Sequence, residues 1–300
     1  MPSPWQQLSE HVWLIPGGVN SVVLAHRGRA LLVDTGADRD AGNRLVRGLR
    51  ERDWSLEAIV TTHSHADHIG GHAAVLRRHD VPVFAPALED AFVRHPELES
   101  ISLFHGATPP AELTGRWLQA EPSRVDHDLP EGPLELIGLS LEVLAVDGHA
   151  PRQRALRVGD VVIAGDAVFG ASALARHPLL FAHDVAAQRR SAERIGTEVA
   201  RLAVPGHGAP DTPARLARAT VAAIDRARDA VRAALAAHPT GAETGDLLRE
   251  VCDALGARID DLPRWHLNHT TLCAYLVAAR AAGEADVRVD AGSLRWFPRS

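Results

Sequence analysis

The chain of 300 residues contains no lysine, so all of its fixed positive charge comes from arginine. Its 32 arginines face 38 acidic residues, and the formal net charge is −6 with neutral histidines. A protein that binds nucleic acid over a broad surface needs a basic face. The charge balance therefore argues against such a surface. The hydrophobic share of 46% is enough for a sizeable folded core.

Cysteine is nearly absent as well, because only Cys252 and Cys273 occur. Two cysteines do not make a disulfide framework, and a reducing compartment is the simplest setting for them. The first residues lack the basic and apolar pattern of a secretory signal. No apolar run approaches the length that crosses a bilayer. We therefore expect a cytoplasmic protein of enzyme size that does not enter membranes.

Short apolar strands and amphipathic helices make up the first two thirds of the chain. Gly-rich turns separate the expected strands at 12–15, 21–26, 29–34 and 57–62. Helical patterns lie at about 39–52 and 68–79, and 155–166 has the pattern of a hairpin. Strands mixed with helices predict a layered α/β sandwich.

Two stretches depart from this pattern. Residues 95–133 are rich in Pro and Gly, with one expected short helix near 111–118, and are long for a connection. We expect this insertion to fold over a site. From residue 212 onward helices are followed by a hairpin, which is the order of a winged helix; the expected elements are 213–237, 244–256, 263–283 and 285–298. We therefore expect a catalytic domain at 1–211 and a smaller domain at 212–300.

The most informative stretch is TTHSHADHIGG, residues 61–71, which contains His63, His65, Asp67 and His68. It begins where an expected strand ends, so the side chains at 63 and 65 can share a direction. Asp67 and His68 begin the next helix and can turn toward the same point. Imidazole suits zinc and other transition metals, and carboxylate suits a harder ion. The cluster therefore favours metal ligation over a set of surface histidines.

A catalytic metal needs ligands from other segments too. Three loops offer them, each after a short apolar strand, where α/β sites commonly gather. They are DGHAP with His149, AGDAVF with Asp166, and VPGHGAP with His207.

With VDTG at 33–36, these motifs resemble the metallo-β-lactamase-fold hydrolase superfamily over about residues 8–210. The resemblance implies an α/β (α+β) fold, a four-layer αββα sandwich with a two-metal site at one edge. The tail, HLNHTTLCAYLVAARAAGEADVRVD, resembles the small winged-helix appendix of the lactamase-β-2-like hydrolases.

The resemblance also implies a role for each motif residue. His63, His65 and His149 would bind the first metal, and Asp67, His68 and His207 the second. Asp166 would bridge the two ions, and Asp34 would steady the ligand loops from behind.

The implied chemistry is hydrolysis by a metal-bound hydroxide of a small ester, thioester or lactone. Two divalent ions are expected, with zinc first and iron or manganese as alternatives. Asp67 would be catalytic, because it could orient the hydroxide and pass its proton to the leaving group. His183 and His105 are the candidates for substrate contact.

Two other activities fit parts of the pattern. One is an endoribonuclease of the lactamase-β-2-like type, and the other is a persulfide dioxygenase with a single iron. Residues 231–300 carry eight arginines and nine acidic residues, a balance that disfavours RNA. The glutathione-binding lysine of glyoxalase II-type thioesterases has no counterpart in this chain. We therefore expect a small-molecule substrate, with a homodimer as one option for the oligomeric state.

Overall fold

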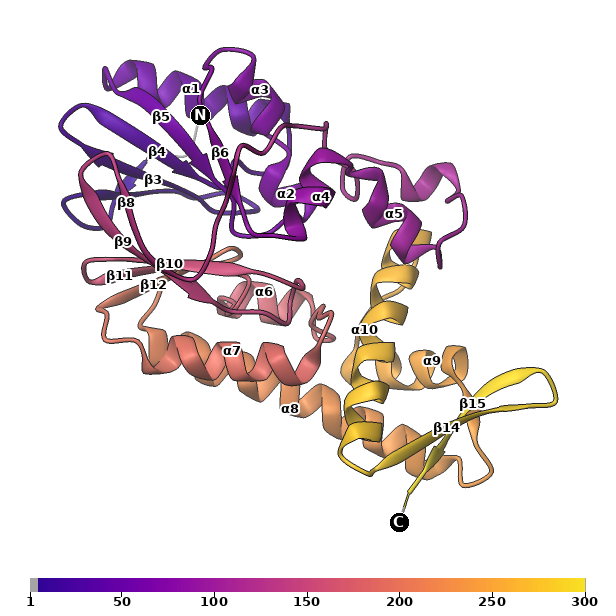
Figure 1. Ribbon diagram of the computed structural model, residues 1–300. Helices are drawn as coiled ribbons and strands as arrows, with labels where there is room; N and C mark the ends of the chain where they lie inside the picture. The colour runs from indigo at the N-terminus through magenta and orange to yellow at the C-terminus, as the bar shows by residue number, and fades with distance from the viewer. Residues whose placement is uncertain (1–4, 300) are drawn as a thin grey trace.

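The computed structural model describes residues 5–299. Figure 1 shows two sheets lying against each other, helices on their outer faces, and a C-terminal extension to one side. Among the described residues, none of the helices combines the length and apolar character that would let it cross a bilayer.

The first sheet contains the N-terminal strands in sequence order. They are β1 Gln6–Gln7, β2 Val12–Ile15, β3 Ser21–His26, β4 Arg29–Val33, β5 Ser55–Val60, β6 Val83–Ala85 and β7 His127–Asp128. Neighbours are antiparallel from β1 to β4 and parallel from β4 to β7. Helices α1 (Arg39–Glu51) and α3 (His72–Leu76) cover its outer face. Their Leu45, Leu49 and Val75 are buried against Leu32 and Ile59 of the sheet.

The second sheet has the order β12-β11-β10-β9-β8. Its strands are β8 Gly132–Leu136, β9 Leu139–Ala145, β10 Arg154–Val158, β11 Val161–Gly165 and β12 Leu202–Pro205. Helices α7 (Val185–Thr197) and α8 (Pro213–Ala237) pack on its outer face through Ile195 and Leu216.

The inner faces of the two sheets share one apolar core. Leu24 and Val60 from the first sheet are buried in the same cluster as Val143 and Leu156 from the second. Burial on both faces explains why residues 22–25 of β3 and most of β11 are continuously apolar rather than alternating. The expected four-layer αββα sandwich is confirmed.

The expected helix at 68–79 is two short helices, α2 (Ala66–Ile69) and α3. The glycine pair between them explains the break. A Cβ on Gly71 would lie 2.5 Å from the carbonyl oxygen of Thr35, and one on Gly70 would collide with the backbone of Ala37. The chain thus approaches the loop after β4 closely, which brings this loop beside the stretch 61–71.

The insertion has more regular structure than expected. It is preceded by α4 (Glu89–Arg94) and contains α5 (Glu97–Leu103), the 3-10 turn η1 (Ala111–Leu113) and β7. Only the turn falls within the helix expected near 111–118. Leu103, Leu113 and Leu118 form a small buried cluster against Leu267 of the C-terminal region.

The C-terminal region follows the expected order of helices and hairpin. Its elements are α8, β13 Ala242–Glu243, α9 Thr244–Leu255, α10 Leu262–Ala281, β14 Ala285–Asp290 and β15 Ser293–Pro298. Leu272, Tyr275 and Leu276 of α10 are buried in a core that also contains Phe169 and Leu180, beside α6 (Ala171–Arg176). These three side chains follow helical spacing, so one face of α10 is packed in this core. The boundary at 211/212 and the likeness to a winged helix stay predictions.

Candidate metal centre

The stretch 61–71 runs from the end of β5 to the start of α3 and carries four of the predicted ligands. His63 and His68 are fully buried. His65 is the N-cap residue directly before α2, and Asp67 lies in the first turn of that helix. The strand end and the helix start thus turn all four side chains toward the same edge of the sandwich.

One group of donor atoms consists of imidazoles alone. The ring nitrogens of His63, His65 and His149 lie within 4.8 Å of one another. Nδ1 of His65 is 3.1 Å from Nε2 of His63 and 2.9 Å from Nε2 of His149. We call these three residues the imidazole group. Three converging imidazole nitrogens match the donors that zinc and related ions take in catalytic sites.

A second group combines imidazole with carboxylate, and we call it the mixed group. Donor atoms of Asp67, His68 and His207 again lie within 4.8 Å of one another. Nε2 of His207 is 3.3 Å from Oδ2 of Asp67.

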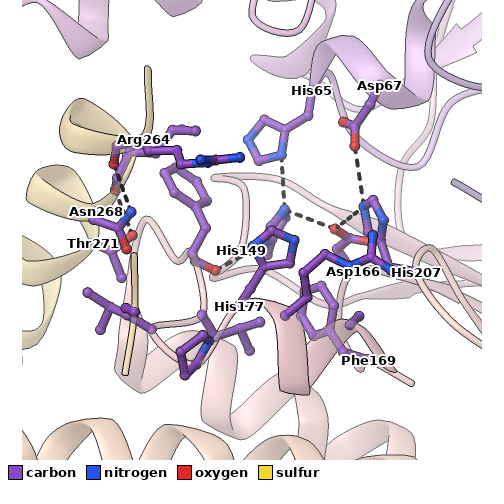
Figure 2. Close-up of a pocket in the computed structure, with 18 of the residues that line it drawn as sticks. His65, Asp67, His149, Asp166, Phe169, His177, His207, Arg264, Asn268 and Thr271 are labelled. Atoms are coloured by element: carbon purple, nitrogen blue, oxygen red, sulfur yellow. Dashed lines mark hydrogen bonds and ion pairs between the residues drawn. The ribbon is translucent and has the colours of Figure 1, made fainter. Parts of the chain in front are cut away.

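Asp166, which directly follows β11, lies between the two groups. Its Oδ1 is 3.5 Å from Nε2 of His68, and its Oδ2 is 3.3 Å from Nε2 of His149 and 3.4 Å from Nε2 of His207. Figure 2 shows this carboxylate between His149 and His207. A carboxylate in this place can contact an ion in either group.

Two buried atoms of the cluster lack a hydrogen-bond partner among the described residues, namely Nε2 of His68 and Oδ1 of Asp166. Leaving such atoms unpaired in a protein interior is costly. Ligation of a cation would satisfy both. The residues present therefore fit a bound metal.

Contacts behind the donors orient the rings. Nδ1 of His149 donates to the carbonyl of Phe181 at 3.0 Å, and Nδ1 of His207 donates to that of Gly18 at 2.9 Å. Because a carbonyl can only accept, each neutral ring keeps its proton on Nδ1 and turns a free Nε2 toward the centre.

Asp34 lies behind the mixed group. Its carboxylate accepts hydrogen bonds from the backbone N–H of Thr62 at 2.8 Å, the hydroxyl of Thr62 at 2.7 Å and Nδ1 of His68 at 2.8 Å. Its backbone has a φ of +54°, a conformation that aspartate tolerates better than most residues. Asp34 thus contacts both Thr62, directly before His63, and the ring of His68, and its supporting role stays a prediction.

The sequence interpretation overlooked Glu89, which lies behind the imidazole group. This carboxylate is 1% exposed and accepts hydrogen bonds from the backbone N–H and hydroxyl of Ser64 at 3.1 and 2.5 Å. It also accepts from the backbone N–H of Arg152 at 3.0 Å. Glu89 therefore joins the loop of His63 and His65 to the loop of His149. Its position soon after β6, like the ligands that follow other strands, is the signal that could have revealed it.

The loop between β2 and β3 holds the loop that carries His207. Nδ2 of Asn20 donates to the carbonyls of Pro205 and Gly208 at 2.8 and 2.7 Å, and the backbone N–H of Asn20 donates to Gly206. Residues 18–20 thus hold His207 through its side chain and through the backbone of the residues on either side of it.

The protonation of the two groups differs in the metal-free protein. Burial lowers the pKa of His65 to about 3, with His149 adding to the effect, and burial also lowers the pKa of His63. Burial opposes charge on His68 too, but Asp166 and Asp34 outweigh it and raise its pKa to about 9. Asp166 and Asp67 likewise raise the pKa of His207 to about 11 against the effect of burial.

A cavity of about 760 Å³ opens beside the cluster, with His65, Asp67 and Asp166 in its wall. Arg264, Asn268 and Thr271 of α10 line the opposite side (Figure 2). The insertion contributes Glu99, Trp117 and Leu118. The C-terminal region and the insertion therefore both face the candidate metal centre.

The two residues predicted to contact substrate lie elsewhere. His183 is exposed, and its backbone N–H donates to the carbonyl of His149, but it does not line the cavity. His105 packs on α10, with its ring 5.7 Å from that of His269. The cavity is lined instead by His177 and Glu99. Burial and the nearby carboxylates of Glu89 and Asp67 raise the pKa of Glu99 to about 7.

Known proteins share this fold and parts of the sequence. Residues 14–207 match the family described as the metallo-beta-lactamase superfamily. A probable metallo-hydrolase, YqgX, of Bacillus subtilis (strain 168) is 27% identical over 51% of this chain and 68% of its own length. A hydroxyacylglutathione hydrolase of Methylobacillus flagellatus is 32% identical, but the match covers 51% of this chain and 48% of that enzyme.

A solved structure extends the likeness to the C-terminal region. The crystal structure of a metallo-beta-lactamase family protein from Thermus thermophilus has a TM-score of 0.74 and 25% identity. The match covers 98% of this chain and all of that one. Since the family match spans most of the sandwich and its ligand motifs, this chain belongs to the metallo-beta-lactamase superfamily.

Proposed function

We propose that the protein is a hydrolase that uses two divalent metal ions to cleave an ester, thioester or lactone. Zinc is the first candidate for both ions. The observation that supports this most is that Asp166 connects the imidazole group to the mixed group. One ion in each group would leave Asp166 as their common ligand. The similarity to a hydroxyacylglutathione hydrolase supports hydrolysis as the reaction class.

Divalent ions bound here would polarise the scissile carbonyl and make water a better nucleophile at neutral pH. The residues of the chain supply position and proton transfer. Burial alone would raise the pKa of Asp67, but His207 and His68 outweigh burial and hold that pKa below its ordinary range. Bound cations would favour the same ionised form once they displace the protons of His68 and His207, so Asp67 would be a carboxylate that can accept a proton from the attacking water at Oδ1 or Oδ2. Because Asp67 also lines the cavity, it can return that proton to the leaving group.

Metal analysis and a substrate panel would test this proposal. We expect two metal equivalents per chain and hydrolysis of at least one ester, thioester or lactone. Asp67→Ala should lower kcat by about 10²–10⁴-fold, the usual range for loss of a general acid–base group. Asp229→Ala, which changes an exposed aspartate of α8, is the matched control and should leave kcat unchanged.

Two outcomes would contradict the proposal in favour of the alternatives. A single iron with oxygen consumption would indicate the persulfide dioxygenase. Cleavage of RNA, with tight binding that weakens steeply with salt, would indicate the endoribonuclease. A folded Asp67→Ala variant with an unchanged rate would remove the role assigned to that carboxylate.

A further inference from the structure

A second cavity meets the first at the metal centre. It has a volume of about 930 Å³ and extends from Asp67 and His207 to helix α1. Asp67, His207 and Trp117 line both cavities. The candidate centre therefore lies at the junction of two cavities rather than at the closed end of one, so a substrate can extend to both sides of its scissile bond.

The wall of the first cavity nearest the centre is apolar. Phe169, Leu179 and Leu180 are each about 5% exposed or less, and Phe181 and Leu267 continue the same surface. Three exposed arginines, Arg176, Arg258 and Arg264, also line this cavity. An apolar wall of this kind favours the hydrocarbon part of a ligand.

The second cavity shares Arg176 and Arg264 with the first and adds two arginines of α1. Arg44 and Arg47 line it from α1, three residues apart and so on one helix face. Both are exposed, and neither forms an ion pair with a carboxylate among residues 5–299. Besides Asp67, the cavity is lined by the acidic residues Asp38, Glu51, Glu112 and Asp261. The carboxylates of Asp38 and Asp261 are engaged in capping α1 and α10, where they accept from the N–H groups of Ala41 at 2.8 Å and Arg264 at 2.7 Å. Guanidinium groups without a protein partner suit a phosphate or carboxylate.

We propose that the substrate is an acyl thioester or ester with an anionic leaving group. Its apolar acyl chain would occupy the first cavity, and a phosphate or carboxylate on the leaving group would bind Arg44 and Arg47. This inference rests on the proposed hydrolase function. Water adds its oxygen to the acyl carbon and the carbon–sulfur or carbon–oxygen bond breaks. One proton of the water passes to the leaving thiolate or alkoxide, and a carboxylic acid and a thiol or alcohol are released.

The test compares three thioesters with the same acyl chain: octanoyl-coenzyme A, which carries phosphates, S-octanoylglutathione, which carries carboxylates, and neutral S-octanoyl-N-acetylcysteamine. We expect kcat/KM to be higher for at least one anionic thioester than for the neutral one. The double variant R44A/R47A should lower kcat/KM for that anionic thioester about tenfold or more, mainly through KM. Hydrolysis of the neutral thioester should change less than about twofold. Arg50→Ala, an exposed arginine of α1 outside the cavity, is the control.

The outcomes separate this inference from the proposed function. Loss confined to octanoyl-coenzyme A would support a phosphate, and loss confined to S-octanoylglutathione a carboxylate. Equal turnover of neutral and anionic thioesters by the unchanged protein would overturn the inference alone, as would equal losses on all three in R44A/R47A. If the metal-loaded protein hydrolysed none of the three, the thioester form of the proposed function would fail together with the inference.

Discussion

The two donor groups that Asp166 connects differ in charge and in the residues that support them. The imidazole group consists of neutral rings, and Glu89 joins its two loops. The mixed group contains a carboxylate and two imidazoles with raised pKa values, and Asp34 supports it. Metal-free, the first group presents free donor nitrogens, whereas the second holds protons that a metal must displace. The two sites should therefore differ in metal affinity and in its dependence on pH.

The largest effect should come from changing Asp166, the proposed common ligand of the two groups. Asp166→Asn keeps the shape of the side chain but removes its negative charge, so both groups lose a ligand of the preferred type. Breaking a buried charged contact costs about 3–5 kcal/mol, and we expect turnover to fall on the order of 10³-fold. Metal content should fall in both groups. His65→Ala and His207→Ala serve for comparison, since each should remove about one equivalent and spare the other group.

An Asp166→Asn protein that keeps two metal equivalents and a normal rate would show that the two groups are independent. Circular dichroism of the metal-free variant must first show an unchanged fold.

A smaller and selective effect is expected from the supporting carboxylates. In Glu89→Gln the amide can turn an N–H toward the N–H groups of Ser64 and Arg152, so the two ligand loops lose part of their common anchor. Loss of such a supporting contact typically weakens metal binding about 10–100-fold. We expect this loss at the imidazole group alone, and the same loss at the mixed group alone for Asp34→Asn.

Competition with a chelator, followed by metal analysis, would measure both affinities. Glu97→Gln, which changes an exposed glutamate of α5, is the control. If Glu89→Gln weakened both groups equally, Glu89 would support the fold rather than one site. Restored affinity in Glu89→Asp would argue that the carboxylate itself matters.

The smallest effect is proton release on metal binding. His68 and His207 have pKa values of about 9 and 11 without metal, so both are protonated at pH 7. Filling the mixed group should therefore release protons, and its affinity should rise as the pH rises from 6 toward 9. The imidazole group is already neutral in this range and should show no such dependence. Calorimetry in buffers with different ionisation enthalpies would count the protons, and an equal count for both binding steps would refute the difference.

Local patterns were sufficient to predict most of the fold. Alternating or continuous apolar runs marked strands such as β3 and β11, and Thr212-Pro213 marked the start of α8. The helix expected at 68–79 was wrong in its middle because the Gly70–Gly71 pair packs against another segment. Helix periodicity carries no information about such an approach.

For the site too, local patterns predict some features, whereas others depend on contacts between distant segments. The residues of the seven predicted donors lie in motifs that follow strand ends, and the structure brings all of them together. Glu89, the two cavities and the positions of His105 and His183 depend on how the insertion and α10 fold over the sandwich. These contacts join segments far apart in the chain, so no local pattern predicts them.

The hydrogen bonds from Asn20 to the loop of His207 determine when the donor groups can assemble during protein synthesis. Asn20 and Pro205 are separated by 185 residues. The hydrogen bonds between Asn20 and the loop of His207 can therefore form only after almost the whole sandwich has left the ribosome. At about 5–20 residues per second, tens of seconds of chain growth can pass between the two segments. A nascent chain can offer the histidines of 63–68 to a passing ion early, but it cannot complete the centre. The full donor set, which needs His207, can therefore assemble only late in synthesis.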